Sequence, residues 1–146
     1  MRNNVFALGG EGIVALGKAE PHVSFTMYHN VLLSDGEPVF AGGYGWDVRR
    51  PGAVDSFSNV VWDLRGTPVA ARPKGHGAGG DVRGGPVAWD AWQRLGLDRG
   101  SVVADPRLKD PAGGDFLPAA DSPAFGLGFR PIDLSRVGPR PPGERD

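Results

Sequence analysis

Hydrophobic residues of this chain recur in three stretches that resemble one another. Each begins with Asn-Val and a short apolar run, continues through a glycine-containing turn and ends at a second apolar segment. The three stretches are NVFALGGEGIV from Asn4, NVLLSDGEPV from Asn30 and NVVWDLRGTPV from Asn59. Their openings lie 26 and 29 residues apart, and a period in this range that contains strands and turns only is typical of a solenoid. The pattern therefore predicts stacked repeats.

Alternating side chains mark another strand before the second stretch. Residues 23–28 alternate apolar and more polar positions, which is the period-2 pattern of a half-buried strand. Each repeat is interpreted as one coil of a parallel β-helix, with neighbouring strands at the usual spacing of about 4.8 Å. This stacking places Val5, Val31 and Val60 in one column.

The three asparagines fall at the same turn of successive repeats. Asn4, Asn30 and Asn59 would then lie above one another. Stacked amides can donate and accept hydrogen bonds along the column, and so satisfy buried backbone groups of the turn. The sequence predicts a structural ladder here, and substrate contact is the alternative.

The pattern changes after residue 72. Residues 72–85 have no hydrophobic period, and residues 87–95 carry Trp89, Trp92 and Leu95 at a spacing of three. A proline precedes this segment and a glycine follows it, as is common at the two ends of a helix. The sequence predicts a short helix at 87–95 whose tryptophan face packs on the side of the coils. The region from 105 onward is dense in turn signals and predicts a capping segment laid across the last coil.

The predicted fold class is all-β: a right-handed parallel β-helix of about three coils with one short lateral α-helix and an irregular C-terminal cap. The chain begins inside the first repeat, and a solenoid needs a cap at each end. We therefore expect it to be the C-terminal piece of a larger domain, whose missing N-terminal coils would be its partner. The predicted divisions are 1–72 for the coils, 73–100 for the loop and helix, 101–137 for the closing strand and cap, and 138–146 for a disordered tail.

Composition narrows the class of protein. The 146 residues include 24 glycines and 14 prolines, which together with the apolar runs indicates many turns. With 16 basic and 17 acidic residues there is no field that would attract nucleic acid, and no apolar run is long enough to span a membrane. The chain has no cysteine, no metal-ligand spacing among its three histidines and no signal peptide. No metal and no cofactor are expected.

The C-terminal half carries several short motifs in order. The stretch SVVADPRLKDPAGGDFLPAADSPAFGLGFRPIDLSRVGPR resembles the closing segment of bacterial right-handed parallel β-helix proteins related to glycoside hydrolases. The stretch AEPHVSFTMYHNVLLSDGEPVFAGG is similar to the last coils of that family, and WQRLGLD to its lateral helix. Arg107 and Lys109 depart from the pattern, since the family places apolar residues there.

The resemblance implies a carbohydrate-active protein. We expect the C-terminal portion of a polysaccharide-degrading glycoside hydrolase, inactive alone, with a polysaccharide lyase as a poorer choice. A full-length protein of this kind would be extracellular or periplasmic. The alternative is a non-catalytic β-helix that serves as a surface, adhesion or scaffold module, because β-helices host several functions.

Glycoside hydrolysis normally uses two carboxylates at a defined separation. Glu20 and His22 stand at a coil corner, and Asp55 begins the corresponding strand one coil later. These three residues are the candidate catalytic set, and a hydrogen-bonded corner that joins two coils is the alternative. Asp35 and Asp63 fall in comparable turns and are assigned to turn formation.

Aromatic side chains stack on sugar rings, and loops on rigid scaffolds often carry binding residues. Tyr28, Tyr44 and Trp46 are the candidate aromatic residues for carbohydrate binding, with Asp47 beside them in the segment GGYGWD. The alternative is that these aromatics cover the side of the coils or contact the helix.

Overall fold

The chain is described by a computed structural model that covers residues 1–18, 22–44, 54–72 and 86–133. It is mostly β-strand with two short helices, so the predicted all-β class is confirmed. The elements are β1 Val5–Ala7, β2 Val14–Lys18, β3 Phe25–Tyr28, β4 Val31–Ser34, β5 Phe40–Tyr44, β6 Val54–Phe57, β7 Val60–Asp63, β8 Val69–Arg72, β9 Val87–Ala88, α1 Trp89–Arg94, β10 Val102–Val103, β11 Leu108–Asp110, β12 Asp115–Pro118 and α2 Pro123–Gly126.

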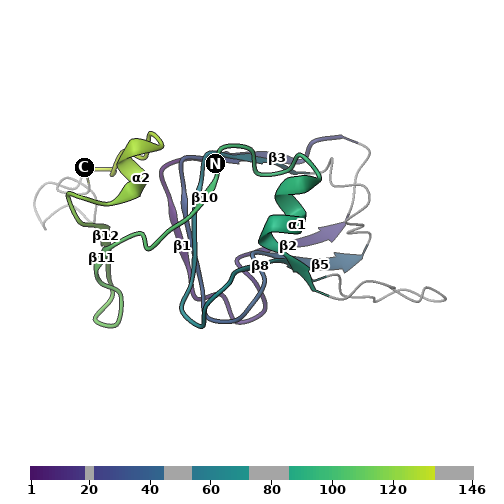
Figure 1. The fold of residues 1–146 in the computed structure, drawn as a ribbon, viewed down its shortest axis with the longest axis horizontal. Helices are drawn as coiled ribbons and strands as arrows, with labels where there is room; N and C mark the ends of the chain where they lie inside the picture. Colours follow the sequence, from purple (N-terminus) through teal and green to yellow (C-terminus); the bar gives the residue numbers. More distant parts are fainter. Residues whose placement is uncertain (19–21, 45–53, 73–85, 134–146) are drawn as a thin grey trace, which may run out of the picture.

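Strands from successive repeats pair with one another in parallel. The sheet orders of these strands are β1-β4-β7-β10, β3-β6 and β2-β5-β8-β9, where β9 joins β8 antiparallel; β11 and β12 form a separate antiparallel pair. In the first sheet Val5, Val31, Val60 and Val102 are consecutive partners, so the predicted valine column is confirmed and gains a fourth member. Figure 1 shows the three sheets as three sides around a common interior. We call each set of strands at one level a layer.

A partial fourth layer was not predicted as a repeat. Arg99 pairs with Phe57 in parallel, and Ser101 stands where the other layers have asparagine. The residue just before that position has positive φ in every layer: Asn3 57°, His29 54°, Ser58 51° and Gly100 71°. The motif Arg-Gly-Ser-Val-Val therefore follows the same corner as the Asn-Val stretches, with glycine supplying the left-handed conformation at low cost.

The predicted asparagine ladder is confirmed. Asn30 Oδ1 accepts hydrogen bonds from Asn4 N and Nδ2 at 3.1 and 3.2 Å. Asn59 Oδ1 accepts in the same way from Asn30 N and Nδ2, both at 3.0 Å. Ser101 Oγ continues the column by accepting from Asn59 N at 2.9 Å. The ladder satisfies the backbone of a corner that is fully buried at Asn30 and Asn59.

The helix closes one end of the interior. Inward side chains such as Met27, Leu32 and Phe40 form the main core, and Trp89 and Trp92 of α1 belong to it with 2% exposure each. The rings of Trp92 and Phe40 are stacked at 5.3 Å. The helix lies within the outline of the three sheets in Figure 1, so it covers the end of the core rather than the outer side of the coils.

The C-terminal segment covers the outer face of the first sheet. The β11–β12 hairpin and α2 lie outside the strands β1 and β10 in Figure 1. Phe129 and Ala124 form a second apolar cluster with Val31 and Val60, and Arg130 N donates to Asn3 Oδ1 at 3.0 Å. This segment therefore runs alongside several layers instead of lying across the last one.

Candidate functional site

Two of the three candidate catalytic residues, His22 and Asp55, fall within the described chain, before and in the strands of the β3–β6 sheet. His22 is exposed and precedes β3, whereas Asp55 is the exposed second residue of β6 and pairs with Thr26 of β3. Glu20 lies outside the described residues. The described chain thus places Asp55 on the outer face of the sheet, and the cluster of the three stays a prediction.

The candidate binding residues are divided in the same way. Tyr28 is the last residue of β3 and is half-buried. Tyr44 is the last residue of β5, but its side chain is outside the described part of the chain. Trp46 and Asp47 are also outside it. The structure therefore bears on Tyr28 alone.

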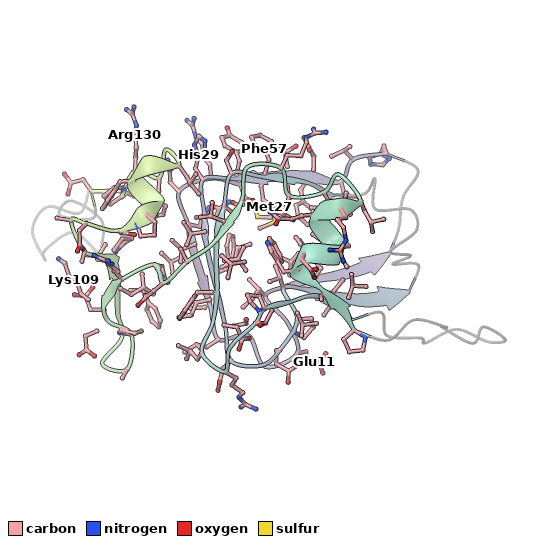
Figure 2. All side chains as sticks on the ribbon, in the orientation of Figure 1. Glu11, Met27, His29, Phe57, Lys109 and Arg130 are labelled. Atoms are coloured by element: carbon pink, nitrogen blue, oxygen red, sulfur yellow. The ribbon has the colours of Figure 1, made fainter. Side chains whose placement is uncertain are left out.

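The outer face of the β3–β6 sheet carries a pair of stacked aromatic rings. Side chains alternate along a strand, so the inward position of fully buried Met27 places its neighbour Tyr28 on the outside. Phe57 is the partner of Tyr28 in β6, and their rings lie 5.1 Å apart with an interplanar angle of 3°. In Figure 2 Phe57 lies along the edge of the molecule, whereas Met27 lies on the inner side.

Arginines continue this column in both directions. Arg2 is the parallel partner of Tyr28, and Arg99 is the parallel partner of Phe57. We name the four residues Arg2, Tyr28, Phe57 and Arg99 the aromatic column. Both arginines are exposed, and neighbouring members of such a column are about 4.8 Å apart along the sheet. The surface is a narrow aromatic strip with a positive charge at each end.

Polar groups border the column. The ring of His29 stands edge-on to Tyr28, with centroids 4.9 Å apart and an interplanar angle of 81°. Asp55 and Thr26 occupy the outward positions two residues before Phe57 and Tyr28. Figure 2 places His29, Phe57 and Arg130 along the same edge of the molecule. A ligand on the rings would therefore meet hydrogen-bond acceptors on one side and cationic donors at the ends.

Sequence reasoning selected Tyr28 but missed the other three members of the column. The signal was present, because each of them stands two residues before the corner position of its layer: Arg2 before Asn4, Phe57 before Asn59 and Arg99 before Ser101. Residues at equal positions of a repeat share one face, so the register fixes the column once the fourth layer is recognised.

Other aspartates serve the structure, as predicted for Asp35 and Asp63. Asp63 is buried and accepts from Ser34 Oγ at 2.6 Å, from Gly36 N at 2.8 Å and from Arg65 N at 2.7 Å. Arg65 Nε also lies 2.8 Å from Asp35 Oδ1, and this hydrogen bond lowers the pKa of the Asp35 carboxyl. Both turns are therefore held by bonds between layers, and the hydrogen bond from Arg65 favours the charged form of Asp35.

Asp98 is a buried acid that sequence reasoning did not single out. Its carboxylate accepts from Trp92 Nε1 at 2.9 Å, from Ser56 Oγ at 2.6 Å and from Ser101 Oγ at 3.1 Å. The residue is 1% exposed. These bonds join the helix to the third and fourth layers, so Asp98 is a structural acceptor rather than a surface acid.

The described ranges hold neither a candidate metal site nor a candidate membrane-spanning helix. No group of three or more His, Asp or Glu side chains in this part of the chain is arranged to hold a metal ion. None of its helices is long and apolar enough to cross a membrane.

The comparisons with known proteins give no relative for this chain. No family model matches the sequence, and no curated protein and no solved structure is similar to it. The aromatic column and the acids beside it therefore carry the functional argument.

Proposed function

We propose that the chain is a carbohydrate-contacting segment of a parallel β-helix protein and that the aromatic column is its sugar-binding surface. The observation that carries the proposal is the stacked pair of rings Tyr28–Phe57 on an outer sheet face, with Arg2 and Arg99 next to it in register. Aromatic faces offer large apolar area at low entropic cost, and the polar groups around them fix the orientation of a ligand.

The finer fold proposed is a right-handed parallel β-helix of about three coils. It is supported by the sheet orders, in which strands at equal positions of successive repeats pair in parallel. Right-handedness is the strong preference for connections between parallel strands of one sheet. On this basis the resemblance to β-helix proteins related to glycoside hydrolases stays our guide to the substrate class.

In the proposed protein, a polysaccharide chain lies along the column and passes Asp55. A glycoside hydrolase of this kind, acting outside the cytoplasm, would use Asp55 with Glu20 and His22 as its acid–base set. Retaining enzymes need two carboxyl groups about 5–5.5 Å apart and inverting enzymes about 6.5–9.5 Å apart. The segment alone would bind sugar weakly and would not cleave it.

Binding to a panel of neutral and uronate-containing polysaccharides, measured by affinity electrophoresis and calorimetry, tests the proposal. Phe57→Ala should weaken the binding of the preferred polysaccharide about tenfold, which corresponds to about 1.4 kcal/mol. Leu117→Ala is the matched control, because Leu117 is an exposed apolar residue of β12, outside the column. Equal loss in both variants, or binding unaffected by Phe57→Ala, would exclude the column as the site.

The second candidate function is a non-catalytic scaffold module. It is favoured by the use of Asp35, Asp63 and Asp98 in bonds that join elements of the fold. A chain that binds no polysaccharide of the panel but folds cooperatively would support the scaffold and count against the carbohydrate proposal.

A further inference from the structure

His29 stands at the corner of the second layer, beside the aromatic column. Its backbone has a φ of 54°, and the residues at the same corner of the other layers are Asn3, Ser58 and Gly100. Such a corner needs a residue that adopts the left-handed conformation, as asparagine, glycine and histidine do more readily than most. The corner itself does not require a ring, so the imidazole of His29 calls for a separate explanation.

The C-terminal segment contacts one face of this imidazole. A β-carbon at Gly128 would lie 2.9 Å from His29 Cε1 and 3.1 Å from both ring nitrogens. Similar distances to three atoms of one ring place Gly128 over the face of the imidazole, in direct contact with it. Gly128 also has a φ of 96°, so glycine meets both the backbone conformation and the close approach.

The segment around Gly128 is itself anchored. Phe129 is 5% exposed and packs in the apolar cluster that contains Val31. Arg130 N donates a hydrogen bond to Asn3 Oδ1 at 3.0 Å. The backbone that covers the imidazole is therefore fixed by apolar packing on one side and by a hydrogen bond on the other.

The ring nitrogens of His29 are left for a ligand. The Tyr28 ring stands edge-on to the imidazole with centroids 4.9 Å apart, and Figure 2 shows His29 on the same edge of the molecule as Phe57. Within the described ranges neither ring nitrogen has a hydrogen-bond partner, and the residue is only half-buried. The donor and acceptor directions of an imidazole lie in the ring plane, whereas Gly128 covers a face. A ligand on the column can therefore reach these nitrogens.

We propose that His29 is a further ligand-binding residue, which hydrogen-bonds a hydroxyl group of the sugar that contacts Tyr28. This inference rests on the proposed function and adds to it a polar residue supported by the C-terminal segment. Sugar hydroxyl groups both donate and accept, so either ring nitrogen can bind one. An imidazole that is already held in place loses little conformational entropy on binding. The column supplies apolar contact, and His29 supplies the directional bond that selects the orientation of the sugar.

Two substitutions at His29, tested with the preferred polysaccharide of the panel, separate a hydrogen bond to the ligand from packing alone. His29→Phe keeps a ring between Gly128 and Tyr28 but has no nitrogen. His29→Asn suits the corner backbone but is too short to reach the positions of the ring nitrogens. Each should weaken binding about fivefold, as expected for the loss of one hydrogen bond. Ser58→Asn is the matched control at the same corner of the third layer and should keep the wild-type affinity.

The outcomes distinguish this role from the proposed function. Binding that Phe57→Ala weakens but His29→Phe leaves unchanged would overturn the role of His29 and leave the proposed function standing. An equal loss in Ser58→Asn would also overturn it, because the effect would then belong to the corner and not to the imidazole. A wild-type chain that binds no polysaccharide of the panel would exclude the proposed function and the role of His29 with it.

If the His29 variants fail to fold in urea-unfolding controls, NMR spectroscopy of the imidazole nitrogens in the wild-type chain tests the same contact. Addition of the preferred polysaccharide should shift the resonances of the His29 ring nitrogens, and the shifts should saturate at the same concentrations as binding measured by calorimetry. Resonances that do not move at saturating polysaccharide would overturn the proposal.

Discussion

The two ends of the stacked layers are built from the same repeat, but their core side chains are covered to different degrees. At one end, α1 brings Trp89 and Trp92 over the core, and each is 2% exposed. At the other end, formed by β1 and β2, Phe6 and Ile13 are only half-buried, and Leu8 is 45% exposed. The comparison shows that repeated residues bury the interior between layers, whereas an end needs residues that the repeat does not contain.

Hydrogen bonding follows the same division. Inside the stack, each asparagine oxygen receives two donors from the preceding layer. At the covered end, Ser101 Oγ accepts a hydrogen bond from the backbone N–H of Asn59 and donates one to the Asp98 carboxylate. The same carboxylate accepts a hydrogen bond from Trp92 Nε1. The buried carboxylate of Asp98 thus joins the ladder to the helix, and the hydroxyl of Ser101, the last member of the ladder, has an acceptor.

Removing the helix closure should have the largest effect. Trp92→Ala leaves a cavity over Phe40 and takes one donor from Asp98, so we expect a loss of about 3–5 kcal/mol in the free energy of unfolding. Trp92→Phe keeps most of the ring but not the N–H, and should cost about 1–2 kcal/mol. Urea denaturation followed by circular dichroism measures both.

Leu95→Ala is the control for this closure. Leu95 follows α1 and is 61% exposed, so its truncation should change stability by less than about 0.5 kcal/mol. If Trp92→Ala were no more destabilising than Leu95→Ala, the helix would not close the core, and the contrast between the two ends would be wrong.

The ladder offers a direct comparison between a buried rung, Asn59, and its half-buried first rung, Asn4. Asn59 is fully buried and its Nδ2 also donates to Ser56 Oγ at 3.0 Å, so Asn59→Ala should cost about 2–3 kcal/mol. Asn4→Ala removes a half-buried amide in the first layer and should cost less than about 1 kcal/mol. Thermal and urea unfolding of the two variants measure the difference.

Asn59→Ser is the matched variant, since serine occupies this position in the fourth layer as Ser101. It retains an oxygen at the corner and should lose less stability than Asn59→Ala. Similar losses for Asn4→Ala and Asn59→Ala would mean that both rungs contribute equally, and burial would then not explain the contribution of a rung to stability.

The sequence predicted the contacts between equivalent residues of the repeats. It did not predict several of the contacts made by residues outside the repeats. The Asn-Val stretches predicted the valine column and the ladder, because neighbouring layers contact each other through equivalent residues. The tryptophan spacing of α1 predicted a helix, but not that its side chains enter the end of the core. That placement depends on Asp98 and the core beneath it, which lie outside the periodic pattern.

The candidate site shows the same limit. Tyr28 was selected as a single aromatic residue, and its partner Phe57 was missed because the column appears only when the layers are in register. The position of the C-terminal segment was also missed. Its phenylalanines were expected over the last coil, but the outer side chains of Val31 and Val60 form an apolar face that Phe129 covers instead.

The smallest expected effect comes from an ion pair between the two ends of the stack. Asp35 and Arg65 join turns of neighbouring layers, and both side chains are largely exposed. The hydrogen bond from Arg65 lowers the folded-state pKa of Asp35. The carboxylate therefore contributes stability above its unfolded-state pKa, and this contribution is lost as the pH falls through the folded-state pKa.

Asp35→Asn should therefore reduce the free energy of unfolding slightly at neutral pH. In acid, the free energies of unfolding of the variant and the wild type should become more similar. Urea unfolding across this pH range, repeated at high salt, measures the effect, and screening should shrink it further. A loss as large as that of Asn59→Ala would mean that turn charges, and not the buried ladder, hold the layers together.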